Sequence, residues 1–253
     1  HGPGPLHSKP PFDVLYEDNH LLVIDKPAGL ATMGVADSVP SALSLAKAYI
    51  KQKHQKPGNV YLGIVSRLDA PVSGVLLLAR TSKSAARLTE QFRSRSVKKH
   101  YWALVEGIVE ADHGELCDWV RKDDRHRRMH IASEKTPGAK QALSNFRVLR
   151  TYKDMTLIEV ELQTGRKHQI RLQWSHQGHP VVGDRKYGAQ RPFSHGIALH
   201  SRFVEFVHPV RREPVVLEAS LPPAWADYGL SDRKKITKIT NSEDVAWRAG
   251  GDV

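Results

Sequence analysis

A loop between two apolar segments holds the first side chains with the types and spacing to do chemistry. It has the sequence SRLDAPVSG over residues 66–74, in which the carboxylate of Asp69 follows the guanidinium of Arg67 by two residues. An isolated carboxylate can act as a nucleophile or as a base. Asp, Pro, Ser and Gly are also the residues of ordinary turns, so the spacing alone fits a plain turn too. The position of the loop between two expected strands favours a functional role.

A second group of polar side chains lies in the basic run TGRKHQIR, residues 164–171. Thr164 is of a type that caps helices, so we expect a helix to begin there. Its first turn is expected to hold Arg166, Lys167 and His168. The free amide groups of a helix start bind phosphate, and cations beside them strengthen such a site. We expect Ile170 to pack inward and Arg171 to face a pocket; a solvated basic helix start is the alternative.

Other combinations of residues are weaker candidates for a site. Histidines cluster at positions 168, 176 and 179 and at positions 126 and 130, but the sequence has a single cysteine, Cys117. A zinc site needs three or four converging ligands with regular spacing. The sequence contains no G-x-S-x-G nucleophile elbow, phosphate-binding P-loop or dinucleotide glycine fingerprint. We therefore expect no metal and no cofactor.

Four segments occur in an order that is specific to one family. They read RLDAPVSGVLLLARTSKSAARL, KKHYWALVEG, LQTGRKHQIRLQWSHQGHPVVGDRKYG and IALHSRFVEFVHP. With them the chain resembles the RluA/RluD-type RNA pseudouridine synthases over nearly all of residues 12–222. The usual pattern is HRLDxxTSG, KxYxAxVxG, TGRxHQIRxH…GHPxxGDxxYG and LHAxxLxFxHP. Ser66, Val72 and Gln173 stand where that pattern has His, Thr and, frequently, His.

The resemblance implies roles for individual residues. It implies that Asp69 is catalytic, that Arg171 pairs with it, and that Tyr101 stacks on the target uracil. It also implies that Arg67 fills the gap left by the flipped base, while Leu68 and Ile170 wall the pocket. The other residues expected to bind substrate are Arg166, Lys167, His168 and Gln169.

The chemistry of the reaction fits these residue types. The N-glycosidic bond of uridine breaks, the uracil turns over, and its C5 joins C1′ of the same ribose. The product has the same atomic composition as the uridine, so no redox cofactor is required. One carboxylate acts either as a nucleophile toward C1′ or as a base at C2′, and the sequence leaves both routes open. A neighbouring arginine favours the ionised carboxylate and can bind it with two hydrogen bonds.

The composition favours a polyanionic partner. The 253 residues carry a formal net charge of +11, with an isoelectric point near 9.8. The lone cysteine fits a reducing compartment, and no apolar run is long enough to span a membrane. We expect a cytoplasmic monomer that binds RNA, either rRNA or tRNA, and no membrane. Two alternatives are a noncatalytic RNA-binding or assembly factor with the same fold and a basic protein that binds a membrane or another protein.

The elements that must position these residues predict an α+β protein. Apolar strand patterns come in runs instead of alternating with helices, which favours a central mixed, mostly antiparallel sheet flanked by helices and loops. Helices are expected to begin near Ser41 and to be capped by Ser82. Residues 110–141 are expected to be irregular or an exposed hairpin. We expect a flexible lead-in over residues 1–11, a catalytic domain over 12–225 and a polar tail over 226–253.

Overall fold

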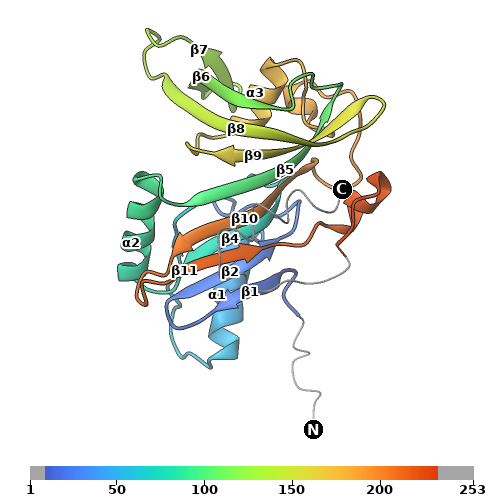
Figure 1. Cartoon of the computed structure of the whole chain (residues 1–253). Coiled ribbons are helices and arrows are strands. Elements are labelled where there is room, and N and C mark those ends of the chain that lie inside the picture. Colours follow the sequence, from blue (N-terminus) through green and yellow to red (C-terminus); the bar gives the residue numbers. More distant parts are fainter. Residues whose placement is uncertain (1–8, 233–253) are drawn as a thin grey trace.

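The computed structural model describes residues 9–232, and their strands form one sheet. The strand order is β1-β2-β4-β10-β5-β9-β8-β6-β7, with β11 beside β10 and β3 beside β4 (Figure 1). The strands are β1 (Asp13–Glu17), β2 (Leu21–Lys26), β3 (Gly63–Ile64), β4 (Ser73–Ala79), β5 (Lys98–Glu106), β6 (His113–Asp123), β7 (Arg128–Ala132), β8 (Lys140–Thr151), β9 (Met155–Leu162), β10 (Leu199–Val207) and β11 (Pro214–Glu218).

The sheet is mixed, as expected, because one pairing differs in direction from the rest. Strands β4 and β10 run parallel over a short stretch, while the other pairings are antiparallel. Three α-helices and two short 3-10 helices accompany the strands in the described part of the chain. They are α1 (Ala42–Lys53), α2 (Ser82–Arg93), α3 (Gln169–His176), η1 (Arg185–Tyr187) and η2 (Pro223–Tyr228). The predicted α+β class is confirmed.

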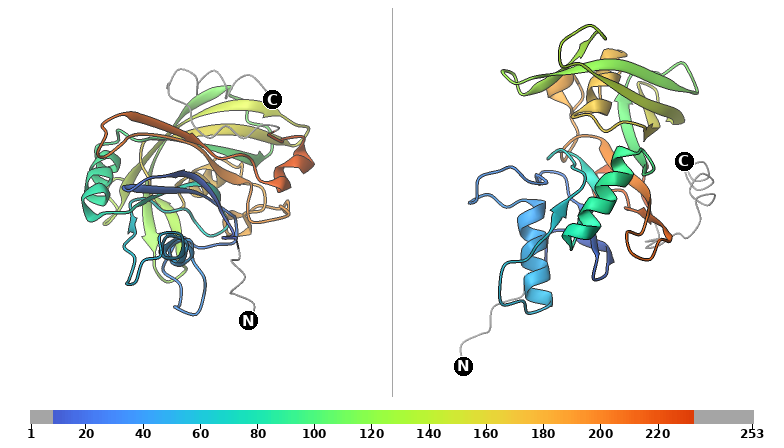
Figure 2. Two further views of the ribbon diagram at one scale, coloured as in Figure 1. Left: turned by 90° about the horizontal axis from the view of Figure 1, so that it is seen from below. Right: turned by 90° about the vertical axis from the view of Figure 1, so that its left-hand side faces the viewer.

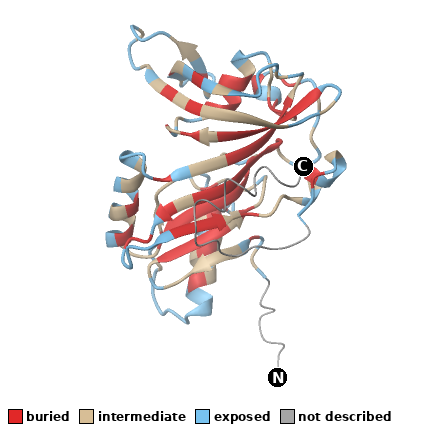
Figure 3. Cartoon of the chain, viewed as in Figure 1, coloured by how far each residue is buried: buried red, intermediate tan, exposed pale blue. Residues whose placement is uncertain are grey.

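Strands β2 and β4 are apolar on both faces because a helix covers each face. Side chains alternate between the two faces of a strand. One set packs with α1 in the larger core and comprises Leu22, Ile24, Leu76 and Leu78. The other set packs with Leu88 of α2 and comprises Leu21, Val23, Val75 and Leu77. Figure 2 shows the two helices from two further directions, and Figure 3 shows buried residues concentrated along the central strands.

The starts of α1 and α2 agree with the sequence to within one residue. Ser41 caps α1 and forms a capping box with Ser44. The cap of α2 is Thr81 instead of the predicted Ser82, and its Oγ1 accepts a hydrogen bond from the Ser84 amide at 3.1 Å. Two adjacent hydroxyl residues make the sequence signal ambiguous by one position. Residues 110–141 contain the antiparallel hairpin of β6 and β7, one of the two predicted alternatives.

Near the C-terminus the described residues continue to pack beyond position 225. Trp225 and Leu230 are buried, and Arg202 donates a hydrogen bond to Asp232 at 2.8 Å. Most of the predicted lead-in (1–11) and tail (226–253) lies outside the described residues. Within the described residues, no helix is long and apolar enough to cross a membrane.

Candidate active site

Strand register brings the Asp69 loop next to Tyr101. Gly74 of β4 pairs with Ser201 of β10, which in turn pairs with Tyr101 of β5. A Cβ on Gly74 would lie 2.2 Å from the Ser201 carbonyl oxygen, and the φ of Gly74 is +119°. Only glycine permits this close approach of two backbones. The loop that precedes β4 is therefore held beside the middle of β5.

The carboxylate of Asp69 lies in a cavity of about 730 Å³. Its Oδ2 accepts a hydrogen bond from Nη1 of Arg171 at 3.2 Å. The Asp69 side chain is 29% exposed and that of Arg171 only 6%, so the carboxylate is open to a ligand while its cation is not. Asp69 comes from the loop before β4 and Arg171 from the first turn of α3.

Asp184 fixes the direction of Arg171. Its Oδ2 accepts from Nε of Arg171 at 2.7 Å and its Oδ1 accepts from Nη2 at 2.9 Å, with the carboxylate buried. This two-bond pair leaves Nη1 directed at Asp69. Burial acts to lower the pKa of Arg171, but the hydrogen bonds to Asp184 raise it above its ordinary value. Arginine was expected to form its two-bond contact with Asp69, whereas the structure gives that contact to Asp184.

The buried side chain of Lys26 supports the Asp69 loop. Nζ of Lys26 has no exposed surface and donates to the carbonyl oxygens of Pro27 at 2.7 Å, Leu30 at 2.6 Å and Ala70 at 3.2 Å. Burial lowers the pKa of Lys26 to about 8, while the negative charge of Asp69 acts in the opposite direction. Lys26 therefore connects the segment after β2 to the residue that follows Asp69. The sequence showed it only as the end of a strand.

The segment before α3 differs from the prediction. The helix begins at Gln169, and His168 at the cap position has a left-handed backbone with φ +55° and no capping side-chain bond. Oγ1 of Thr164 instead donates to Oε1 of Gln169 at 2.7 Å and accepts from the Leu143 amide at 2.9 Å. The predicted cap at Thr164 is wrong, because this hydroxyl is used to attach the loop to β8. Residues 166–168 consequently precede the helix.

His168 faces the second oxygen of the Asp69 carboxylate. Its Nε2 lies 3.7 Å from Oδ1 of Asp69, and its Nδ1 lies 2.6 Å from the Tyr187 hydroxyl. That hydroxyl accepts from the Met129 amide at 3.0 Å, so its own proton is assigned to Nδ1 of His168. Burial lowers the pKa of His168 to about 4, against the effect of Asp69. The imidazole is therefore neutral at neutral pH, with its N–H directed toward Asp69.

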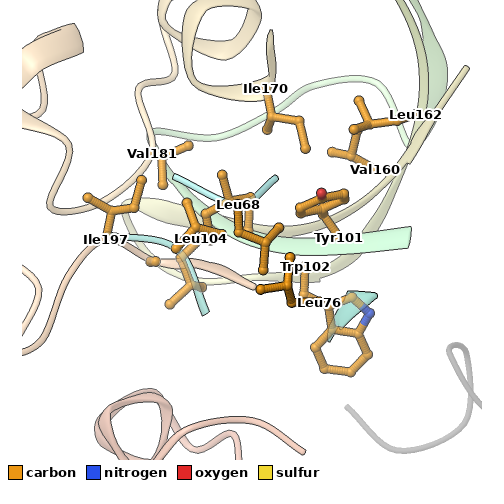
Figure 4. Close-up of a cluster of buried hydrophobic side chains, with 14 of the residues drawn as sticks. Leu68, Leu76, Tyr101, Trp102, Leu104, Val160, Leu162, Ile170, Val181 and Ile197 are labelled. Carbon is orange, nitrogen blue, oxygen red and sulfur yellow. The ribbon is translucent and has the colours of Figure 1, made fainter. Parts of the chain in front are cut away.

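Tyr101 provides an aromatic wall. Its side chain is buried. Burial is the larger cause that raises the pKa of its phenol and the negative charge of Asp69 is the smaller one, so the phenol stays protonated. Figure 4 shows the ring on β5 in the same apolar cluster as Leu68, Leu162 and Ile170. These residues also line the cavity of Asp69. An apolar wall with one aromatic face suits a flat base.

The structure brings all the predicted site residues to this one cavity. They are Arg67, Leu68, Asp69, Tyr101, Arg166, Lys167, His168, Gln169, Ile170 and Arg171. Two further cations, Lys122 of β6 and Lys186 of η1, line it as well. Burial and the like charges of Arg171 and Lys167 lower the pKa of Lys186. The sequence alone gave no individual role to Lys122, Lys186 or Asp184.

The other candidate clusters in the described residues have structural partners. His126 and His130 both contact Oδ2 of Asp123, at 2.7 Å and 2.9 Å. His179 uses Nδ1 to contact the Glu106 carbonyl oxygen at 2.8 Å. Nowhere among residues 9–232 do three or more His, Cys, Asp or Glu side chains gather in a way that could hold a metal ion.

Comparison with known proteins decides the family. Residues 20–176 match the family model described as RNA pseudouridylate synthase. The chain belongs to this family. It is 35% identical to the Bacillus subtilis protein called uncharacterized RNA pseudouridine synthase YhcT, over 83% of this chain and 69% of that one. The predicted family and enzyme class, an RNA pseudouridine synthase and hence an isomerase, are confirmed.

Two named relatives and two solved structures agree with this assignment. Ribosomal large subunit pseudouridine synthase D of Xylella fastidiosa is 34% identical, over 84% of this chain and 66% of that one. Dual-specificity RNA pseudouridine synthase RluA of Pasteurella multocida is 34% identical, over 85% of this chain and 95% of that one. The chain spans about two thirds of the length of YhcT and of the Xylella protein.

The solved structures are similar in fold. Human RNA pseudouridylate synthase domain containing 4 superimposes with a TM-score of 0.72 at 24% identity, covering 87% of this chain and 94% of that one. Human RNA pseudouridylate synthase domain containing 1 gives 0.70 at 22% identity, with 97% of each chain covered. The pseudouridine synthase fold expected from the sequence is confirmed.

One of the three departures from the family pattern, Val72, lines the cavity of Asp69, and its backbone amide donates to the Asp69 carbonyl oxygen at 2.9 Å. Val72 is buried in the core. Gln173 is fully buried and donates to Oδ2 of Asp118 at 2.9 Å and to the Ala142 carbonyl at 3.2 Å, so it attaches α3 to the outer strands. Ser66 lines a smaller, neighbouring cavity. Among the described residues, none of the three side chains forms a hydrogen bond or ion pair with the Asp69 carboxylate or with Arg171.

Proposed function

We propose that this pseudouridine synthase isomerises uridines of structured RNA, with rRNA favoured and tRNA the second candidate, and that Asp69 is its catalytic residue. One observation carries the proposal. The accessible carboxylate of Asp69 lies 3.2 Å from a buried arginine whose direction is fixed by a second, buried carboxylate. Relatives that share about a third of their residues with this chain are named for the large ribosomal subunit, which supports rRNA.

The residues around the carboxylate suit the chemistry of this isomerisation. The N1–C1′ bond breaks and a C5–C1′ bond forms, while the proton on C5 leaves and N1 gains one. The cation of Arg171 favours the ionised form of Asp69, which both the nucleophilic and the base routes need. Arginine suits this position because it stays charged when buried. The neutral imidazole of His168 lies beside the other carboxylate oxygen, with 3.7 Å between Nε2 and Oδ1.

Substrate binding follows from the walls and rim of the cavity. A uridine must leave its stack to place C1′ beside Asp69. Tyr101, Leu68 and Ile170 offer the apolar surface for the flipped base, and stacking on an aromatic ring contributes about 1–3 kcal/mol per base. The rim cations, among them Lys122 and Lys186, are suited to backbone phosphates. We also propose that the enzyme acts as a monomer, because the residues of one copy suffice to form the cavity.

The experiment that tests the proposal offers the purified protein unmodified transcripts of rRNA and tRNA and maps pseudouridine in each. We expect new pseudouridine at a few positions, first in rRNA, and none with Asp69→Asn. Modification confined to tRNA would reverse the order of the two substrates. Binding of RNA without pseudouridine in any transcript would contradict the proposal and favour the noncatalytic RNA-binding alternative.

A further inference from the structure

A second cavity of about 280 Å³ adjoins the first. The two share the lining residues Arg67, Leu68, Tyr101, Leu162, Gly165 and Arg166. The rest of the lining of the second cavity consists of Val65, Ser66, Val75, Leu77, Phe92, Lys99, Ser201 and Val204. The aspartate lies only in the first cavity. A linear polymer that places one of its residues beside Asp69 can therefore place the adjacent residue in the second cavity.

Lys99 is the charged group of this second cavity whose position is hardest to explain by folding alone. Its Nζ lies 5.4 Å from the centre of the Phe92 ring. A Cβ added to Gly165 would lie 3.0 Å from the same Nζ. Among the described residues no carboxylate lies within ion-pair distance of Lys99. Burial lowers the pKa of Lys99, which means that its charged form destabilises the folded protein.

The rest of the cavity lining strengthens the positive charge. Arg67 and Arg166 also line it, and no acidic side chain does. Arg166 is held in place by its Nε, which donates to the Gln141 carbonyl oxygen at 2.8 Å. Burial, and then the like charge of Arg95, lowers the pKa of Arg166. Several positive charges therefore surround an apolar surface, and no acidic side chain of the cavity neutralises them. Such a cavity is suited to the negatively charged group of a ligand.

We propose that the second cavity binds a phosphodiester group of the RNA, on the linkage that adjoins the target uridine. The inference rests on the proposed RNA substrate, because the anion must belong to the strand whose base enters the first cavity. Lysine binds phosphate as a point charge. Arg166 lines the same cavity and can bind the same phosphate. The apolar wall of Val65, Phe92 and Val204 then contacts the sugar beside that phosphate.

The test measures binding of the trinucleotide UpUpU and of its analogues with a neutral methylphosphonate at the first, the second or both linkages. Wild type should lose about tenfold in affinity at one linkage, equivalent to about 1.4 kcal/mol. Lys99→Met should bind the natural trinucleotide about tenfold more weakly and show no further loss at that linkage, as coupled partners do. Lys51→Met, which removes an exposed α1 lysine outside both cavities, should behave like wild type.

Melting of the same variants separates binding from folding. Lys99→Met should melt at the same temperature as wild type or higher, because it removes a desolvated charge that has no acidic partner. If that variant does not fold, Lys99→Gln takes its place in the binding measurements. Unchanged affinity in a folded variant, or a methylphosphonate loss that persists in it, would overturn the proposal.

Two further measurements identify the anion and separate this inference from the proposed function. Inorganic phosphate, added at constant ionic strength, should compete with UpUpU no better than chloride. Strong competition by phosphate that is lost in Lys99→Met would mean that the cavity takes a free anion, which overturns the proposal. Coupling between Lys99 and one linkage, without pseudouridine in any RNA, would contradict the proposed function but support this inference. Pseudouridine formation without that coupling would contradict this inference alone.

Discussion

Replacing Asp184 by Asn should both destabilise the protein and slow catalysis. Asp184→Asn keeps the shape of the side chain but removes a buried charge and turns one acceptor oxygen into a donor that faces Arg171. Breaking one side of a buried ion pair costs about 3–5 kcal/mol. For a domain of this size each kcal/mol lowers the melting temperature by about 2–4 °C, so we expect a fall of roughly 6–20 °C.

The matched control for this variant is Asp154→Asn. Asp154 pairs with Arg191 at the surface, where the two side chains are 51% and 42% exposed. An exposed pair of this kind contributes about 0–1 kcal/mol, so its melting temperature should fall by at most a few degrees. The two variants therefore change the same functional group in opposite environments. Equal melting temperatures would refute the claim that Asp184 and Arg171 form a buried structural pair.

The kinetic effect of Asp184→Asn distinguishes positioning from general loss of structure. The assay is single-turnover pseudouridine formation well below the melting transition, paired with measurement of RNA affinity. Because the rim cations of the cavity are unchanged, RNA affinity should stay near that of wild type while the single-turnover rate constant falls. An Arg171 that has lost Asp184 no longer presents Nη1 to Asp69 in one fixed direction. An unchanged single-turnover rate constant would show that the direction of Arg171 does not matter to the reaction.

Three further predictions concern the scaffold and the RNA. Gly74→Ala should cost about 3 kcal/mol or more, because the new Cβ meets the Ser201 carbonyl at 2.2 Å, whereas Gly138→Ala, with open space around it, should cost only about 1–2 kcal/mol in denaturant unfolding. Burial holds the pKa of Lys26 near 8, so the folded protein binds fewer protons than the unfolded chain between pH 8 and 10.5. The stability of wild type relative to Lys26→Met should therefore rise across that window, and a constant difference would contradict the assignment. RNA affinity should fall steeply with salt, by about 0.7–0.9 in log–log slope for each phosphate neutralised, and a flat response would argue against backbone contacts.

The sequence predicted the members of the site better than their partners. The resemblance identified Asp69, Tyr101 and Arg171, and the structure places all three at one cavity. The role of Asp184 could not be read in the same way, although it lies in a quoted motif. Whether its side chain meets Arg171 depends on how the turn before η1 is oriented against α3. That orientation is set by packing between elements and leaves no periodic signal in the sequence.

Lys26 and Thr164 show two other reasons for incomplete prediction. Lys26 is the last residue of β2 and precedes Pro27, so the sequence indicated only that the strand ends there. Its Nζ is enclosed by the segment that follows it, through the Leu30 carbonyl, and by the distant Asp69 loop, through the Ala70 carbonyl. Thr164 has the type of a helix cap, but its hydroxyl is used for a contact with β8 that local sequence does not reveal. Tertiary contacts of this kind override local capping preferences.

The most direct test of the central claim compares wild type with Asp69→Asn in tritium release from RNA labelled at C5 of uridine. Asp69 is 29% exposed and makes one 3.2 Å contact with Arg171, which keeps its two bonds to Asp184. The variant should therefore fold and bind RNA nearly as wild type does, yet release no detectable tritium, since no neighbouring group replaces a nucleophile or base. Release by the variant above a few per cent of the wild-type rate would contradict the account and place the chemistry on another residue.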